Sequence, residues 1–193
     1  MEIRVANINK AFGSHVVLKN ISYVFPNGKR TVLMGDSGCG KTTLLRIFMR
    51  LETPDSGEIE GVPAHIGIVF QEDRLLEKFN AVSNVAFTAD RSVTKQIIFS
   101  HLDEVGLSEN ARQSVNELSG GMKRRVAIVR AMLTKKELLL LDEPLKGLDE
   151  QNRERIAAYI KRHSEGITTI IVTHDPDDIS LFDAGLIKMA GLA

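Results

Sequence analysis

The chain has 193 residues, of which 43% are apolar and 26% charged, a composition that predicts one large domain with its own hydrophobic core. Its 25 basic residues equal its 25 acidic ones, which argues against a domain that grips nucleic acid through phosphates, since such domains carry a basic excess. The single cysteine excludes an internal disulfide, and no apolar run reaches the roughly 18 residues that a membrane-spanning helix needs.

The N-terminal region predicts a pair of antiparallel strands. Residues 1–5 lack the apolar core of a signal peptide, so we expect a chain of the reducing cytoplasm that reaches any membrane through a partner. From Ile3 to Phe25, short alternating apolar stretches are interrupted by Phe12-Gly13-Ser14, a pattern typical of two strands joined by a turn.

The segment 35–42 carries the most specific motif, because it fits the pattern G-x-x-x-x-G-K-[ST]. It follows a compact apolar run from Thr31 to Met34, which predicts a buried strand, and it precedes a helical pattern. Glycines let such a loop aim backbone N–H groups at a phosphate chain, and the helix adds its dipole. We therefore expect a P-loop that binds ATP through Gly35, Asp36, Ser37, Gly38, Cys39, Gly40, Lys41, Thr42 and Thr43.

Two of these residues have expected roles of their own. Lys41 neutralises the β and γ phosphates and acts in catalysis, and the Thr42 hydroxyl ligates Mg²⁺. Cys39 occupies a variable position of the pattern, so we interpret it as a spacer in the loop rather than as a redox or catalytic thiol.

The middle of the chain predicts an inserted helical subdomain over about 72–130. A buried strand is expected at Ile66 to Phe70, and the pattern from about Leu75 to Ser119 is helical. In that block Val93, Ile97, His101 or Leu102, and Val105 are expected on one side of a helix.

Residues 118–122 form a second candidate phosphate site. Ser119 is a good N-cap, and Gly120 and Gly121 leave backbone N–H groups exposed at the start of a basic helix. One chain that binds one ATP has no evident need for this second site.

The C-terminal third predicts a parallel sheet. Leu138 to Leu141 and Ile167 to Val172 are short, wholly apolar strands, and a helical segment from Gln151 to His163 lies between them. Asp142 and Glu143 follow the first strand directly, where open α/β sheets place ligand-binding groups. We expect Asp142 to hold the Mg²⁺ shell and Glu143 to polarise the attacking water as general base.

These three motifs, in this order, resemble the ATP-binding cassette (ABC) family, and the resemblance covers essentially the whole chain. It implies one P-loop NTPase domain over residues 1–193, with a mostly parallel core sheet, an N-terminal antiparallel β subdomain and the helical insertion. In that family two cassettes pair head to tail, and the signature of one closes on the ATP held by the other. Leu118 to Gly121 match the signature, whereas Met122 replaces its usual glutamine.

The resemblance also implies roles for four single residues. Phe12 matches the aromatic that stacks on adenine, with a core aromatic as the alternative. Gln71 matches the glutamine that senses Mg²⁺ and the membrane subunit, and we expect it among the metal ligands. Asp149 matches the loop that links the two ATP sites, with a helix N-cap as an alternative that is compatible with this role. His174 matches the switch histidine that contacts the γ-phosphate. The remaining histidines lack companions at ligand spacing, and we interpret them as surface or half-buried residues: His15, His65, His101 and His163.

The expected function is to bind and hydrolyse Mg-ATP and so energise a membrane transporter. The implied partners are a second copy of the chain in the ATP-bound state, integral membrane permease subunits and a substrate-binding protein, with no nucleic acid. The chain would then lie on the inner face of the cell membrane, held there by the permease. The segment from Phe70 to Leu76 resembles nitrate, sulfonate and taurine importer cassettes.

Three alternatives were weighed. A cassette that drives a membrane complex without transport stays open. A soluble cassette of translation or DNA repair is disfavoured, because those resemble tandem cassettes or carry coiled-coil insertions. A P-loop kinase or GTPase of another family is disfavoured by the signature, by His174 and by the absence of an Asn-Lys-x-Asp motif.

Overall fold

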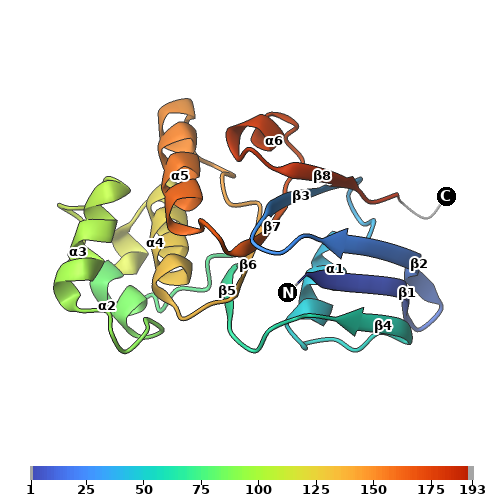
Figure 1. The fold of residues 1–193 in the computed structure, drawn as a ribbon. Coiled ribbons are helices and arrows are strands. Elements are labelled where there is room, and N and C mark those ends of the chain that lie inside the picture. Colours follow the sequence, from blue (N-terminus) through green and yellow to red (C-terminus); the bar gives the residue numbers. More distant parts are fainter. Residues whose placement is uncertain (1, 191–193) are drawn as a thin grey trace.

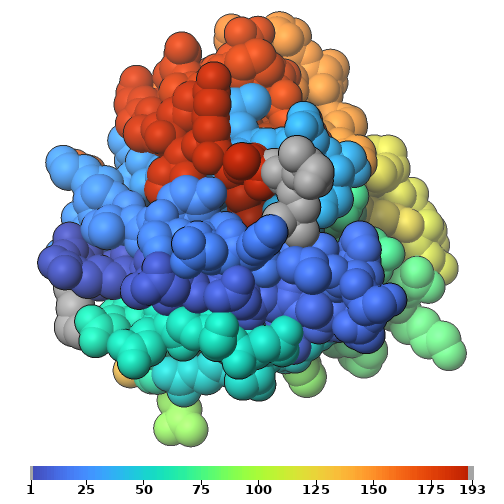
Figure 2. Space-filling view, turned by 90° about the vertical axis from the view of Figure 1, so that its right-hand side faces the viewer, coloured from blue at the N-terminus to red at the C-terminus, as the bar shows by residue number. Residues whose placement is uncertain are grey.

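Eight strands form two sheets in the computed structural model, which describes residues 2–190 (Figure 1). Residues 1 and 191–193 of the expected domain lie outside the described residues. The smaller sheet is antiparallel, in the order β2-β1-β4, which confirms the antiparallel start of the chain. Its strands are β1 (Ile3–Phe12), β2 (His15–Phe25) and β4 (Ser56–Glu60). Figure 2 shows this end of the molecule, with the cyan-green β4 along the lower edge and the red C-terminal segment above β2.

The larger sheet has five parallel strands in the order β5-β6-β7-β3-β8. They are β3 (Arg30–Met34), β5 (Ile66–Val69), β6 (Leu138–Asp142), β7 (Thr168–Val172) and β8 (Gly185–Lys188). The α/β architecture with a parallel core sheet is therefore confirmed. The sequence did not identify β4 or β8, because both are short and mostly exposed and so lack the apolar run that marks the central strands.

Both faces of the parallel sheet are buried, and β6 shows how. Leu138 and Leu140 join one hydrophobic cluster, which contains α1 (Lys41–Phe48) and the inner face of the antiparallel sheet. Leu139 and Leu141 join the other cluster, which contains α4 (Gly120–Leu133) and α5 (Glu150–His163). A strand with alternate side chains in two cores reads as a continuous apolar run, and this is why its sequence pattern was unambiguous.

The helical region between β5 and β6 differs in detail from the expectation. It contains α2 (Ala81–Ala86), α3 (Lys95–Glu104), the 3₁₀ turn η1 (Val115–Glu117) and α4, separated by loops. The sequence predicted the wrong residues for the start of the apolar side of α3, since Ile98 is buried there and not Ile97. Thr94 caps the helix by accepting from the Ile97 N–H, so Val93 precedes the helix and Ile97 is exposed. Ile98, Leu102 and Val105 form the buried side instead.

The last described helix, α6 (Asp177–Leu181), lies between β7 and β8 and was not expected from the sequence. Its segment holds only five helical residues, so it shows less than two turns of the apolar periodicity. None of the helices in residues 2–190 combines the length and the apolar character that crossing a bilayer requires.

Candidate active site

The loop between β3 and α1 has the geometry that the phosphate-binding motif requires. Gly38 and Gly40 have φ of +82° and +96°, in the left-handed region that favours glycine. A Cβ added to Gly40 would lie 2.3 Å from Leu18 Cδ2 and 2.9 Å from the Val17 carbonyl oxygen, so a side chain there would push the loop away from β2. The sheet and the loop together therefore fix the position of the α1 N-terminus.

Lys41 is the first residue of α1 and is buried. Its Nζ donates to the carbonyl oxygens of Gly35 at 2.7 Å and Asp36 at 2.9 Å. The Cys39 thiol lies 3.7 Å from the same nitrogen and is only 6% exposed. The ammonium is thus held inside the loop, where a phosphate chain bound by the loop N–H groups would meet it.

Asp142 stands at the end of β6, against the start of α1. Its Oδ2 accepts a hydrogen bond from the Thr42 hydroxyl at 3.4 Å, so residues 100 positions apart meet at one point. Burial raises the pKa of Asp142, and the Thr42 hydrogen bond partly opposes that rise. A buried carboxylate beside a hydroxyl is a hard oxygen donor set of the kind Mg²⁺ prefers, so the residues present fit this ion.

Glu143 is turned out of the strand by an unusual backbone. Its φ is +52°, a conformation that costs a non-glycine residue roughly 1–3 kcal/mol. Its N–H donates to the Val172 carbonyl oxygen at 2.8 Å, which holds the turn against β7. Burial raises the pKa of its carboxyl, and the charge of His174 partly opposes that rise. The Glu143 carboxylate lies beside His174, 3.1 Å from its Nε2.

His174 follows β7 in a loop held by a buried carboxylate. The hydroxyl of Thr173 donates to Asp178 Oδ2 at 2.5 Å, and Asp178 is buried. Arg153 of α5 donates to Asp178 at 2.9 Å and to Asp175 at 2.6 Å. The His174 side chain itself is 56% exposed, so a ligand can reach it. The sequence analysis missed Arg153 and Asp178, because nothing in their spacing distinguishes them from surface charges.

Gln71 follows β5 in a segment whose backbone is anchored by hydrogen bonds from Arg124 of α4. The guanidinium donates to the carbonyl oxygens of Phe70 and Gln71, both at 2.6 Å, and forms an ion pair with Asp73 at 3.2 Å. Arg130 extends this anchoring, because it donates to the carbonyl oxygens of Asp73 and Arg74, both at 2.8 Å. Sequence reasoning missed both arginines. The run of basic residues after Gly121 was the available signal.

A cavity of about 640 Å³ brings several of these residues together. Thr42, Gln71 and Asp142, the three expected metal ligands, all line it. Gly120 and Gly121 at the start of α4 line it as well.

The other expected residues lie in two helix caps and at the end of strand β1. The Ser119 hydroxyl accepts from the Met122 N–H at 3.3 Å and caps α4, and the Asp149 carboxylate accepts from the Asn152 N–H at 2.9 Å and caps α5. These cap hydrogen bonds lower the pKa of Asp149. In the part of the chain that the structure describes, no hydrogen bond joins either residue to the P-loop. Phe12 is 47% exposed, so the alternative of a core aromatic is wrong, and Lys10 Nζ lies 5.2 Å from its ring centroid.

Comparison with known proteins finds one family. Residues 18–146 match the profile of the family described as ABC transporter. The chain is 38% identical to the sulfate/thiosulfate import ATP-binding protein of Neisseria meningitidis, over all of this chain and 62% of that protein. It is also 38% identical to an aliphatic sulfonates import ATP-binding protein of Pseudomonas syringae pv. tomato, over 92% of this chain and 77% of that protein. The chain thus spans less than two thirds of the sulfate/thiosulfate relative and over three quarters of the sulfonate one.

Two solved structures share the fold. A dimeric bacterial ABC transporter cassette is 28% identical, with a TM-score of 0.83 over 97% of this chain and 94% of that one. A bacterial Atm1-family ABC exporter with ATP bound has a TM-score of 0.85 over 97% of this chain and 36% of that one, and at 23% identity it shows the fold alone.

Proposed function

The chain belongs to the ABC transporter family, and we propose that it is the subunit that binds and hydrolyses ATP to energise a membrane importer. One observation carries the proposal. The hydroxyl of Thr42, next to the P-loop lysine, lies 3.4 Å from the carboxylate of Asp142, the last residue of β6. Glu143 directly follows β6 and pairs with His174, which follows the neighbouring strand β7. Phosphate-binding amides, a metal-binding pair and a base with its partner are what phosphoryl transfer to water requires.

In this proposal each residue acts on bound ATP. Gly35 to Thr43 hold the phosphates, Phe12 stacks on the adenine, and Lys41 exchanges its loop carbonyls for phosphate oxygens. Thr42, Asp142 and Gln71 would hold Mg²⁺, which when bound neutralises charge on the phosphates. Glu143 takes a proton from the attacking water, and His174 contacts the γ-phosphate.

The proposal includes a head-to-tail homodimer in the ATP-bound state. Ser119, Gly120, Gly121 and Asp149 then act on the ATP held by the other copy. The capped α4 start supports this, because Gly120 and Gly121 carry no side chain that would keep a phosphate away from the first N–H groups of the helix. The dimeric cassette found among the solved structures supports the stoichiometry.

The proposed partners are permease subunits and a substrate-binding protein. The relatives named above are import proteins, for sulfate and thiosulfate and for aliphatic sulfonates, which supports the proposal of an importer. We infer one ABC ATPase domain over residues 1–193, with a helical subdomain at about 72–130, on the cytoplasmic face of the membrane.

The proposal is tested by phosphate release from ATP, measured with and without Mg²⁺. We expect Mg²⁺-dependent hydrolysis, and loss of ATP binding in Lys41→Ala. The matched control is Lys95→Ala, which removes an exposed lysine at the start of α3. Hydrolysis that persists in Lys41→Ala, or ATP binding that Lys95→Ala weakens equally, would refute the assignment of the site.

A further inference from the structure

Two histidines and a glutamate form a cluster between α3 and α5. His101 and Glu104 lie one turn apart on α3, and His163 is the last residue of α5. The histidine rings have centroids 4.5 Å apart, and His163 Nε2 lies 3.0 Å from Glu104 Oε2. One ligand atom from each of the three residues lies within 4.8 Å of the other two. The expectation that these histidines lack companions is therefore wrong, because the companion comes from a helix about 60 positions along the chain.

We propose that His101, Glu104 and His163 bind a divalent transition-metal ion of zinc-like chemistry. Two imidazoles and a carboxylate are the protein ligands of open zinc sites, which keep a fourth position for water or substrate. Ligand atoms about 2.1 Å from a tetrahedral ion stand roughly 3.4 Å apart, so small side-chain rotations close the observed cluster around an ion. All three residues are half-buried, which leaves an entry path for the ion.

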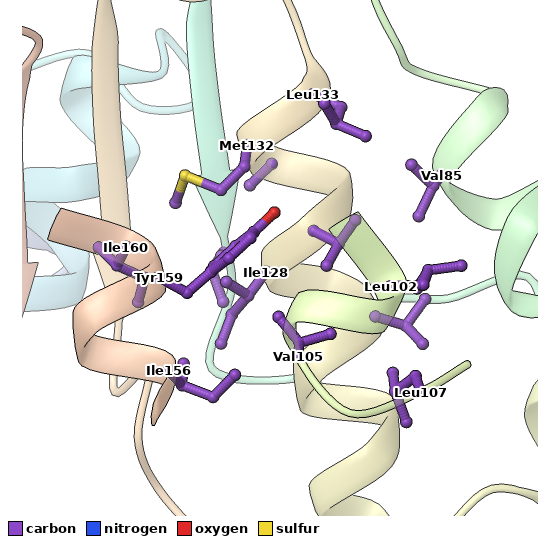
Figure 3. Close-up of a cluster of buried hydrophobic side chains, with 14 of the residues drawn as sticks. Val85, Leu102, Val105, Leu107, Ile128, Met132, Leu133, Ile156, Tyr159 and Ile160 are labelled. Atoms are coloured by element: carbon purple, nitrogen blue, oxygen red, sulfur yellow. The ribbon is translucent and has the colours of Figure 1, made fainter. Parts of the chain in front are cut away.

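The His101 imidazole is already oriented by a residue of the core. Its Nδ1 lies 2.8 Å from the hydroxyl of Tyr159, which is buried. Figure 3 shows the Tyr159 ring reaching from α5 between the side chains of α4 and α3, so its position is fixed by packing. When Nδ1–H donates to the hydroxyl oxygen, the Nε2 lone pair is free for a metal, as in known histidine sites.

The C-terminal end of α3 is joined to α5 independently of any metal. Arg155 of α5 donates from Nε to the Glu104 carbonyl oxygen at 2.7 Å and from Nη2 to the Asp103 carbonyl oxygen at 3.1 Å. The backbone that carries the ligands is therefore held in place before an ion arrives. Preorganised ligands bind a metal with a smaller loss of conformational entropy.

Arg162 competes with a metal for the Glu104 carboxylate. Arg162 donates to Glu104 Oε2 at 2.7 Å, but its side chain is 65% exposed. An exposed ion pair contributes little free energy, so the guanidinium can swing into water when an ion takes the carboxylate. Removal of Arg162 should therefore tighten metal binding, whereas removal of one of the three ligands should weaken it.

The site is separate from the nucleotide site. None of its three ligands lines the cavity that contains Thr42 and Asp142. It joins α3, within the inserted region, to α5, which begins at the Asp149 cap. A bound ion would cross-link two elements that otherwise meet through packing and hydrogen bonds.

The test titrates the full, metal-stripped chain with Zn²⁺ in the absence of nucleotide, and with Co²⁺ as a spectroscopic probe. We expect one equivalent of Zn²⁺ to bind and Co²⁺ to give the visible absorption of a tetrahedral site. His163→Ala and Glu104→Gln should each weaken binding at least tenfold, and Arg162→Ala should strengthen it. At a Zn²⁺ concentration 100-fold above Kd, the melting temperature of the wild type should rise by roughly 5 °C, and that of His163→Ala should not.

The matched control is His65→Ala, since His65 pairs with Glu137 at 3.8 Å but has no third ligand within the described residues. It should leave Zn²⁺ binding unchanged. Wild-type binding that does not exceed that of both His163→Ala and Glu104→Gln would overturn the proposal, as would an equal loss in His65→Ala. Circular dichroism of the metal-free variants checks that they fold, and Glu104→Gln preserves the shape of the site if His163→Ala does not fold.

Discussion

Nε2 of His174 lies 3.1 Å from Oε1 of Glu143, and the two residues follow neighbouring parallel strands whose ends meet through the Asp142–Val172 pairing. The left-handed backbone of Glu143 turns its carboxylate toward the imidazole of His174, which is exposed. Burial raises the pKa of Glu143, which makes its carboxylate a better proton acceptor.

Glu143→Gln should therefore leave ATP binding intact and slow hydrolysis by about a hundredfold or more, the usual loss when a positioned base is removed. Binding is measured with a fluorescent nucleotide, and hydrolysis by phosphate release. Glu137→Gln, at an exposed glutamate before β6, is the control and should keep the wild-type rate. A wild-type rate in Glu143→Gln would show that another group is the base.

Arg124→Lys should lower both the melting temperature and the rate of hydrolysis, because it releases the Gln71 segment. Lysine keeps the charge near Asp73 but cannot donate to the Phe70 and Gln71 carbonyls together, as the guanidinium does at 2.6 Å. Losing one of these part-buried hydrogen bonds costs about 1 kcal/mol, so we expect a lower melting temperature. Because Gln71 is no longer held, hydrolysis should fall by about tenfold while ATP binding stays, and rescue of activity by high Mg²⁺ would support a positioning role.

Arg112→Lys is the control for that variant. Arg112 is exposed and lies over the Phe99 ring at 5.6 Å, away from Gln71. Equal losses of hydrolysis in the two variants would mean that the loss does not come from the Arg124 contacts to the Gln71 segment.

The sequence predicts the central fold well because the buried strands contain uninterrupted apolar runs. β6 and β7 have all five residues buried, and their polar residues, Asp142, Thr168 and Thr169, stand at the strand ends rather than at alternate positions. The exposed strand β4, with one half-buried residue, and the five-residue α6 carry no such signal. The helix bounds between residues 75 and 119 were hard to predict for a similar reason. The helices there are short, so their apolar periodicity spans too few turns to show which side is buried.

The candidate site likewise has parts that the sequence predicts and parts that only the fold brings together. The P-loop is a local motif, so its geometry follows from the spacing of its glycines and Lys41. The meeting of Thr42 and Asp142, 100 positions apart, needed the parallel sheet to bring them together. The arginine anchors and the His101–His163 pair depend on helix packing alone, and no spacing in the sequence encodes them.

Mixing two inactive variants should restore hydrolysis if the sites are shared between chains. Ser119→Arg blocks the signature but keeps the P-loop, and Lys41→Ala does the reverse. A mixed dimer then has one intact site, from the P-loop of the first chain and the signature of the second. Up to about a quarter of the wild-type activity should return in an equal mixture if single sites can fire. Activity strictly proportional to protein concentration, down to the clear monomer, would contradict the dimer.

Alkylation of Cys39 should block ATP binding although the thiol performs no chemistry. Its sulfur is 6% exposed and lies 3.7 Å from Lys41 Nζ, so an adduct would occupy the space of the phosphates. The reaction should be slow, because the loop must open, and Mg-ATP should protect the thiol. Mass spectrometry measures the adduct. Cys39→Ala should stay active and insensitive to the reagent, and an inactive Cys39→Ala would indicate a chemical role for the thiol.

The surface after Gln71 should dock a cytoplasmic helix of the permease. Of the three apolar residues Leu75, Leu76 and Phe79 in this segment, Leu75 is half-buried against the core. Leu76 and Phe79 are 41% and 54% exposed. Their backbone is rigid, because the buried Asn84 accepts from the Leu76 N–H at 2.7 Å and donates to the carbonyl oxygens of both residues.

Leu76→Glu and Phe79→Glu should therefore abolish co-purification with the permease from detergent extracts while basal ATP hydrolysis persists. A charge at an apolar contact is costly to bury, whereas the same charge on the free chain faces water. Val24→Glu, at an exposed valine of β2 in the other sheet, is the matched control and should keep the permease.

The physical reason for choosing this surface is its connection to the candidate active site. Gln71 lines the cavity with Thr42 and Asp142, and Arg124 ties Gln71 to the segment that leads to Leu76. Movement at the γ-phosphate would then reach the permease through one anchored loop. Permease retained by both glutamate variants would place the docking surface elsewhere.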